Sequence, residues 1–219
     1  MKISKIKGIY REGKKIFTEN PKPCKGIKVY NEKLVKYKNK ELRSWNPYRS
    51  KFAAAILKGL SVKLLPNSNV LYLGASTGTT VSHISDILKE GTIYAIENSP
   101  FSLKALLSIC SKRSNIIPFL GDANHPDRYS SITPQVDFIY QDISQRNQAE
   151  IFFKNIERYL KVKGSGILMI KARSIDISLK PKKAYEQVCN ELEKNGLKIN
   201  ELIELSPYEK DHAALSISN

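Results

Sequence analysis

The stretch VLYLGASTGTT, residues 70–80, determines how this sequence folds, because it joins an apolar run to a glycine-containing turn and then to the start of a helix. Gly74 and Gly78 allow the backbone to approach a ligand without a clash at Cβ, and amides at a helix start donate hydrogen bonds to an anionic group. The spacing G-x-x-x-G-T-T is neither the dinucleotide motif G-x-G-x-x-G nor a P-loop. The stretch therefore predicts a nucleotide-type cofactor site at the end of a buried strand.

Apolar runs alternate with amphipathic stretches from residue 69 onward, as is typical of parallel strands connected by crossover helices. We expect strands at 70–73, 93–96, 116–120, 136–140 and 167–170, and helices at 80–88, 100–111, 147–160 and 183–195. Gly196 is expected to cap the last helix.

Two further strands are expected at the end of the chain, at 197–205 and 213–217. The polar segment between them is too short for a parallel crossover, so the two strands should pair antiparallel. A mostly parallel sheet that ends in an antiparallel hairpin is the α/β layout of class I S-adenosylmethionine-dependent methyltransferases. This Rossmann-like layout differs from that of dinucleotide-binding domains, which continue parallel.

The positive charge is concentrated near the N-terminus. The 219 residues carry a net charge of +15; residues 1–63 hold 18 basic and 4 acidic residues, and the other 156 residues are nearly neutral. This asymmetry favours a polyanionic partner, since each phosphate that is neutralised releases counterions and adds affinity. A solubilising, solvated surface is the alternative.

Residues 1–50 read as a small basic β unit of short hairpins, with polar turns near Gly13 and Asn39. A helix should start at Ser50 and end before Gly59. We therefore expect two domains, a β-hairpin domain at 1–50 and the larger sheet domain at 51–219, packed together without a flexible linker.

Several classes of protein are disfavoured. No apolar run approaches the ~20 residues of a membrane span, and residues 1–15 lack the apolar block of a secretory signal, so a cytoplasmic protein is expected. Cys24, Cys110 and Cys189 are spaced too widely for a disulfide framework or a zinc site. No metal is expected.

Acidic residues follow two neighbouring strands of the predicted sheet. Glu97 ends the second strand, where a carboxylate can bind both hydroxyls of a ribose. Asp122 follows the third strand and could meet an adenine amino group, with Ala123 beside the ring. S-adenosylmethionine has the adenine, ribose and carboxylate that would span these positions, and NAD is the competing ligand.

Reactive side chains are expected at the other strand ends. Asp142 ends the fourth strand, Lys171 the fifth, and His212 starts the last strand, while Lys51 lies on the helix before the sheet. Residues beyond the carboxyl ends of parallel strands converge on one crevice, so Asp142 and Lys171 should face the cofactor together. Lys171 closes a buried strand and therefore needs a partner.

In combination, these segments resemble fibrillarin, in its archaeal form without a Gly- and Arg-rich tail. The resemblance covers almost the whole chain and rests on residues 45–51, 72–74, 78–80, 121–123, Asp142 with Gln145 and Gln148, 171–176 and 207–213. Two departures stand out: Ile143-Ser144-Gln145-Arg146 replaces the usual Val-Ala-Gln-Pro, and Ser206 stands where the family often has an acid.

The resemblance implies S-adenosylmethionine-dependent 2′-O-methylation of ribose in rRNA or tRNA, within a box C/D guide RNA ribonucleoprotein. It implies a catalytic tetrad of Lys51, Asp142, Lys171 and His212. Cofactor contacts would come from the loop and strand ends: Gly74, Thr79, Thr80, Glu97, Asn98, Asp122, Ala123, Asp142, Ile143, Ser144 and Gln145. The implied partners are the guide RNA, a Nop-family scaffold protein and a kink-turn-binding protein related to ribosomal protein L7Ae.

Methyl transfer to a hydroxyl is an in-line displacement that needs alignment and loss of a proton. A lysine acts as a base only if its pKa falls, which burial and a nearby cation favour. Lys171 is the candidate base, with Lys51 as the neighbouring cation, Asp142 as the group that orients both, and His212 to position the ribose or shuttle the proton.

Three other functions stay open at this point. A guide-independent RNA 2′-O-methyltransferase is the nearest, since its active site would be the same. A non-catalytic RNA-binding module would explain only the basic N-terminus. A nicotinamide oxidoreductase is supported only by the carboxylate at Glu97.

Overall fold

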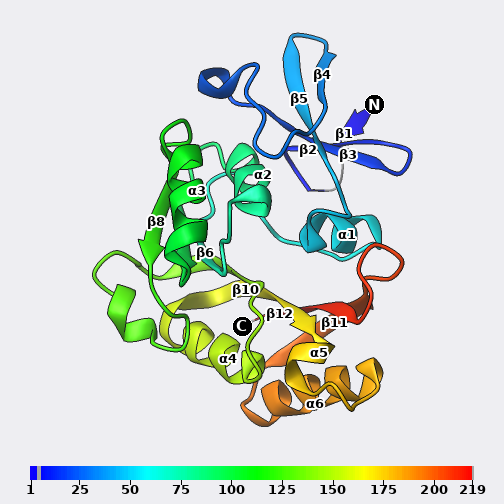
Figure 1. Ribbon diagram of the computed structural model, residues 1–219, viewed down its shortest axis with the longest axis vertical. Helices are drawn as coiled ribbons and strands as arrows, with labels where there is room; N and C mark the ends of the chain where they lie inside the picture. Colours follow the sequence, from blue (N-terminus) through cyan, green and yellow to red (C-terminus); the bar gives the residue numbers. More distant parts are fainter. Residues whose placement is uncertain (4–5, 219) are drawn as a thin grey trace.

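The computed structural model describes residues 1–3 and 6–218 and contains two sheets (Figure 1). The N-terminal sheet is antiparallel with the order β1-β2-β3-β5-β4. Its strands are β1 (Lys2–Ile3), β2 (Ile9–Glu12), β3 (Lys15–Glu19), β4 (Leu34–Tyr37) and β5 (Lys40–Trp45), with the 3-10 helix η1 (Lys22–Cys24) between β3 and β4. Both expected hairpin turns are present, at 13–14 and at 38–39.

The helix α1 (Lys51–Leu57) leads from this sheet to the larger one. Ser50 caps it, as its side chain accepts a hydrogen bond from the Ala53 amide. Lys51 is the first residue of the helix and is half-buried. The apolar residues that follow it are buried. The division into domains at 1–50 and 51–219 stays a prediction.

The larger sheet has the order β11-β12-β10-β9-β6-β7-β8. Its strands are β6 (Val70–Leu73), β7 (Ile93–Glu97), β8 (Ile116–Leu120), β9 (Val136–Gln141), β10 (Leu160–Lys171), β11 (Lys198–Glu204) and β12 (His212–Ser218). The five strands from β8 to β10 are parallel, and β12 is inserted antiparallel between β10 and β11. The prediction of a parallel sheet ending in an antiparallel hairpin is therefore confirmed.

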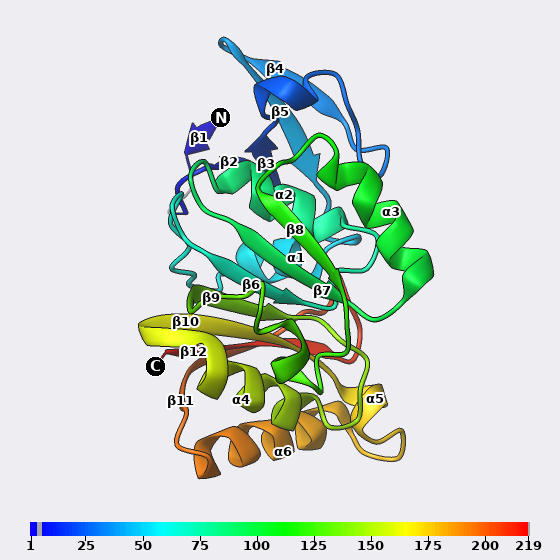
Figure 2. The same ribbon diagram turned by 90° about the vertical axis from the view of Figure 1, so that its left-hand side faces the viewer.

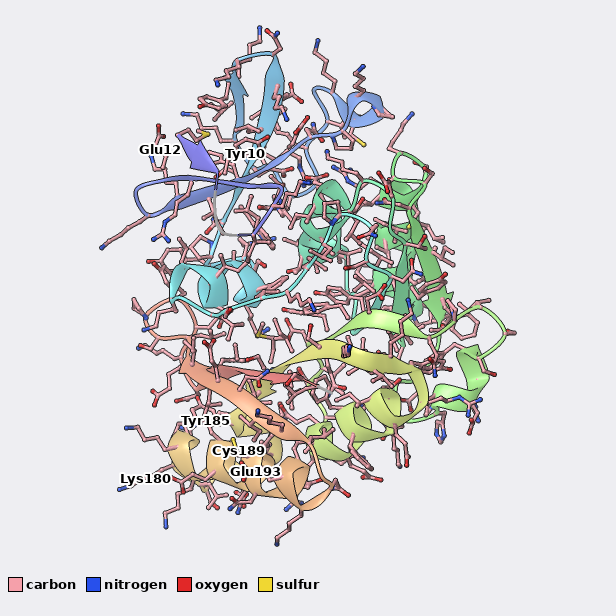
Figure 3. The ribbon with its side chains drawn as sticks, turned by 180° about the vertical axis from the view of Figure 1, so that it is seen from behind. Tyr10, Glu12, Lys180, Tyr185, Cys189 and Glu193 are labelled. Atoms are coloured by element: carbon pink, nitrogen blue, oxygen red, sulfur yellow. The ribbon has the colours of Figure 1, made fainter. Side chains whose placement is uncertain are left out.

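Helices cover both faces of this sheet (Figure 2). The helices α1, α2 (Thr79–Ile87) and α3 (Pro100–Cys110) lie on one face; α4 (Gln148–Tyr159), α5 (Ala172–Ile175) and α6 (Pro181–Lys194) lie on the other, near the 3-10 helix η2 (Pro126–Tyr129). Each face has its own apolar core. The labelled side chains Tyr10 on β2 and Tyr185 on α6 mark opposite ends of the molecule (Figure 3).

The expected strand at 167–170 is the main error in element bounds, since β10 begins at Leu160. Its first half is the polar stretch 161–165, which carries no apolar signal for a strand. Leu160 pairs with Val136 and Ser165 with Phe138, so the extra residues bulge out of the ladder, with Lys163 at φ 64°. The short helix α5 also had no signal in the sequence. No helix among the described residues is long and apolar enough to cross a bilayer.

A buried ionic cluster joins the N-terminal sheet to α2. The Asp86 carboxylate accepts hydrogen bonds from Arg43 at 2.7 Å, Arg113 at 3.1 Å and the Thr18 hydroxyl at 2.8 Å. Arg43 also donates to Glu32 at 2.6 Å, and both arginines are almost fully buried. Two guanidinium groups thus face two carboxylates, and the pKa of the Glu32 carboxyl, which burial alone would raise, is held below its ordinary value by Arg43.

His83 on α2 extends this cluster and is completely buried. The Thr18 hydroxyl donates to Asp86, so it accepts from His83 Nδ1 at 2.6 Å. The Tyr30 hydroxyl lies 2.8 Å from Nε2 and 2.9 Å from the Ser44 carbonyl, and its one proton can be given to either acceptor. Burial, together with Arg43 and Arg113, holds the pKa of His83 well below its ordinary value. The histidine is therefore neutral in the folded chain.

This burial predicts a pH dependence of stability. Below pH ~6.5 an unfolded chain protonates His83 and the folded chain does not, so the free energy of unfolding should fall by up to about 1.4 kcal/mol per pH unit. Urea unfolding between pH 7.5 and 5.5 measures this slope. His83→Gln should lose this component, while His125→Gln, at an exposed histidine, should keep it. Equal slopes in His83→Gln and the wild type would contradict the assignment.

Candidate active site

A cavity of about 460 Å³ opens at the carboxyl ends of β6, β7, β8 and β9. It lies where the strand order reverses, between β6 and β9, which is the usual ligand crevice of an open α/β sheet. All the cofactor contacts expected from the sequence line it: Gly74, Thr79, Thr80, Glu97, Asn98, Asp122, Ala123, Asp142, Ile143, Ser144 and Gln145. Of the expected tetrad, Lys51 and Asp142 line it as well.

The turn after β6 brings the backbone of two strands together. A Cβ at Gly74 would lie 2.3 Å from the Asp142 carbonyl oxygen, and the glycine has φ +83°. Gly78 then forms the N-cap of α2 in the left-handed conformation, with no side-chain cap. The amides at the start of α2 are thus available to an anionic group in the cavity.

Glu97 is held in place by the same turn. Its side chain is buried, and its two oxygens accept hydrogen bonds from the Ser76 amide at 2.6 Å and the Ser99 amide at 2.8 Å. Ser76 adopts the left-handed conformation at φ 50°, which aims its amide at this carboxylate. The carboxylate is therefore fixed before any ligand arrives.

Asp122 lies across the cavity after β8. Its Oδ1 accepts from the backbone amide of Asn124 at 2.9 Å and from the Asn124 side chain at 3.0 Å. The backbone amide of Asn124 lowers the pKa of Asp122 below its ordinary value. Asp122 therefore stays an acceptor, as recognition of an amino group requires.

The expected tetrad forms two pairs. Lys51 Nζ lies 3.0 Å from Asp142 Oδ1 in a half-buried ion pair. Lys171 Nζ donates instead to Ser144 Oγ at 3.2 Å, so Asp142 contacts one of the two lysines that it was expected to orient. His212 pairs with Lys171 across β10 and β12, and its Nδ1 donates to the Lys210 carbonyl at 2.6 Å. Nε2 is therefore the ring nitrogen that is not engaged by this bond.

Gln148 connects the loop after β9 to the end of β10, and it had no role in the sequence-based interpretation beyond the resemblance. Its side chain is completely buried at the start of α4. Its Oε1 accepts from the Lys171 amide at 2.9 Å, while its Nε2 donates to the carbonyls of Gln145 at 3.0 Å and Lys171 at 3.3 Å. The cofactor-side loop and the end of β10 are therefore held together by one side chain.

Other lining residues were not named as site residues, although all but Ile96 lie in the motif segments described above. They are Arg49, Tyr72, Ala75, Ser76, Thr77, Ile96 and Gly121. Arg49 stands two residues before Lys51, within the segment 45–51 on which the resemblance rests. Within the described residues no cluster of three or more His, Cys, Asp or Glu side chains is placed to hold a metal ion.

Comparison with known proteins decides the family. The family model for fibrillarin matches residues 2–218. The chain belongs to the fibrillarin family. A curated fibrillarin-like rRNA/tRNA 2′-O-methyltransferase from Methanocaldococcus jannaschii is 50% identical over 189 residues, which cover 86% of this chain and 82% of the relative. The family prediction is confirmed.

Solved fibrillarins have the same structure. The Aeropyrum pernix fibrillarin, crystallised with natively bound S-adenosyl-L-methionine, superposes with a TM-score of 0.85 at 40% identity and covers 93% of this chain and 88% of its own. A fibrillarin in complex with Nop5p gives 0.88 at 43% identity, covering 96% and 97%. An S-adenosylmethionine-dependent methyltransferase from Aquifex aeolicus, 16% identical with a TM-score of 0.57 over 80% of this chain and 89% of its own, shares the fold alone. The predicted class I fold is thus confirmed for this chain.

The close approach at Gly74 predicts a large effect of one methyl group. Gly74→Ala should weaken binding of S-adenosylmethionine by more than about tenfold, because the new Cβ must displace Asp142 and Ile143 from the cavity wall. Calorimetric titration measures the affinity. Gly196→Ala is the matched control: its φ is +84°, so the backbone strain is similar, but its Cβ would meet nothing within 4 Å. Equal affinities of the two variants would contradict this role of Gly74.

Proposed function

We propose that this fibrillarin transfers the methyl group of S-adenosylmethionine to the 2′-hydroxyl of a ribose in rRNA or tRNA. One observation carries the proposal: a single cavity joins the fixed carboxylate of Glu97 and the open start of α2 to the Lys51–Asp142 ion pair. The relative from Methanocaldococcus jannaschii carries the name of this activity.

The lining residues fit the parts of this cofactor. Asp122 and Ala123 would hold the adenine, Glu97 and Asn98 the ribose, and the amides of Thr79 and Thr80 the carboxylate. Ile143, Ser144 and Gln145 would close the side that faces Lys171. When bound, S-adenosylmethionine supplies an electrophilic methyl group on a sulfonium. The start of α2 would also accept the pyrophosphate of NAD, so the support for S-adenosylmethionine comes from the Aeropyrum pernix fibrillarin, which was crystallised with this cofactor natively bound.

The chain's own residues would then align the ribose and take its proton. Lys171 Nζ accepts the proton of the 2′-hydroxyl, while Ser144 Oγ fixes the position of this nitrogen. The Lys51–Asp142 pair places a cation and a carboxylate beside the reacting atoms. His212 presents Nε2 to the ribose or to the departing proton, because Nδ1 is bound to the Lys210 carbonyl.

Lys171→Ala should lower the rate of methyl transfer by at least about a hundredfold, because loss of a general base has an effect of this size. Binding of S-adenosylmethionine should stay nearly intact, because Lys171 does not line the cavity. Lys161→Ala, at the far end of the same strand, is the control and should keep full activity. A Lys171→Ala variant with near-normal turnover would refute the assignment.

For the partners, the relative solved with Nop5p supports a scaffold protein of that family. A box C/D guide RNA and a kink-turn-binding protein related to ribosomal protein L7Ae complete the proposed particle. Guidance by base pairing suits a chain whose excess positive charge holds an RNA backbone, since backbone contacts position an RNA without reading its sequence.

A methylation assay with and without guide RNA and scaffold tests this proposal. We expect transfer only in the complete particle, at the nucleotide that the guide selects, and at a new nucleotide when the guide sequence is changed. Full activity of the isolated chain on naked RNA would instead favour a guide-independent methyltransferase.

A further inference from the structure

A second cavity, of about 470 Å³, adjoins the proposed cofactor cavity. It lies between segment 27–30 and the end of α3, and the two cavities share Arg49, Thr77 and Thr79 as lining residues. The chain between β3 and β4 lies beside α3 in Figures 1 and 2. A ligand in the second cavity would therefore be next to the methyl donor.

The second cavity is strongly cationic. Lys28, Arg49 and Lys112 line it, are exposed, and make no side-chain ion pair within the described part of the chain. No acidic side chain is among its lining residues. The nearby carboxylates are turned away from it, because Glu32 pairs with Arg43 and Asp86 with Arg43 and Arg113. Three positive charges are thus left without a counterion from the chain.

Both walls of this cavity are fixed. The Glu32 carboxylate accepts hydrogen bonds from the amides of Val29 and Tyr30 at 2.9–3.1 Å, which holds the loop wall. The Cys24 thiol, just before this loop, contacts the Lys112 carbonyl at the end of α3 at 3.2 Å. Arg113 Nη2 donates to Asn20 at 3.2 Å. The walls are therefore connected to each other, and the cavity exists before a ligand binds.

The remaining lining indicates the ligand class. The lining also includes the hydroxyl residues Thr77, Thr79 and Ser108 and the aliphatic residues Ile27 and Ile109. This set suits a phosphate with an attached sugar. The second cavity has no carboxylate that could bind the two hydroxyls of a ribose, whereas the cofactor cavity has Glu97. An enclosed free nucleotide is therefore disfavoured. Cations at an open rim suit a chain of phosphates passing across it.

We propose that this cavity binds a phosphodiester group of the RNA strand whose ribose is methylated, a few nucleotides at most from the target. The proposal rests on the proposed function for the identity of the strand. Arg49, in the wall between the two cavities, then spans cofactor and substrate. This places the substrate strand on the N-terminal side of the site and gives the basic segment around Lys28 a defined task.

The test is RNA binding by the full chain at several salt concentrations, measured by fluorescence anisotropy with a labelled single-stranded dodecamer. Lys28→Glu/Lys112→Glu should weaken binding by about tenfold or more and reduce the slope of log affinity against log salt by about 0.7, the value for one lost phosphate contact on a single strand. The control is Lys104→Glu/Lys194→Glu, which makes the same charge change on α3 and α6 outside the cavity. It should bind RNA nearly as the wild type does.

Equal losses in the two double variants, or no RNA binding by the wild type, would overturn the proposal. Displacement of the dodecamer by AMP or inorganic phosphate beyond the effect of matched ionic strength would overturn it in favour of a small-ligand site. S-adenosylmethionine binding and methyl transfer are measured on the same variants. If the wild type binds RNA through this cavity but the complete particle transfers no methyl group, the proposed function is wrong and the proposed phosphate site is retained.

Discussion

The carboxylate of Asp86 is the constraint on which the geometry of the site depends. Three donors from different parts of the chain, Arg43, Arg113 and Thr18, converge on its two oxygens in the absence of solvent. Loss of one partner of such a pair leaves an unpaired buried charge, which costs about 3–5 kcal/mol. These bonds therefore fix the position of the N-terminal sheet relative to α2. The position of the segment that follows β5 depends on that of the sheet, and this segment places Arg49 and Lys51 at the cavity.

From this constraint the site is assembled by backbone rather than by long side chains. Glu97 is oriented by two amides, Gly74 admits the Asp142 carbonyl, and Gln148 binds the backbone of Lys171 and Gln145. Groups fixed in this way lose little freedom when a ligand binds, which is the general advantage of preorganisation. The side chains that do extend, Lys51 and Lys171, are each anchored at the nitrogen by one residue, Asp142 and Ser144 respectively.

Much of this could be predicted from the sequence because its signals are local. The strands β6 and β8 were predicted with their observed bounds, and the acids Glu97 and Asp122 follow from strand ends and topology alone. The buried cluster could not be predicted, because Arg43 and Glu32 look like ordinary members of a basic segment until the fold brings Asp86 to them. The role of Gln148 and the first half of β10 were not predicted for a similar reason. Gln148 binds Lys171, which is 23 residues away, and the first half of β10 has no apolar pattern.

The basic residues of the N-terminal segment differ in burial and in pairing. The residues of the N-terminal segment were counted together, but Arg43 is neutralised inside the molecule while Lys28 and Arg49 remain at the surface. Glu32 belongs to the same segment and cancels Arg43, so the buried pair leaves the excess of +14 in residues 1–63 unchanged and that excess resides on the other side chains. What matters for a partner is the part of the charge that lacks an internal counterion.

The insertion of β12 between β10 and β11 has a consequence for how the molecule is made. The strand that carries His212 is the last element in the sequence, yet it fills an interior position of the sheet. Until residues 212–218 have been synthesised, β10 and β11 have no common neighbour, and the hydrogen-bonding edge of β10 beside Lys171 stays open. A nascent or truncated chain can thus present the cofactor turn and most of the apolar core, but not the Lys171–His212 pair. Completion of the proposed catalytic end coincides with completion of the sheet.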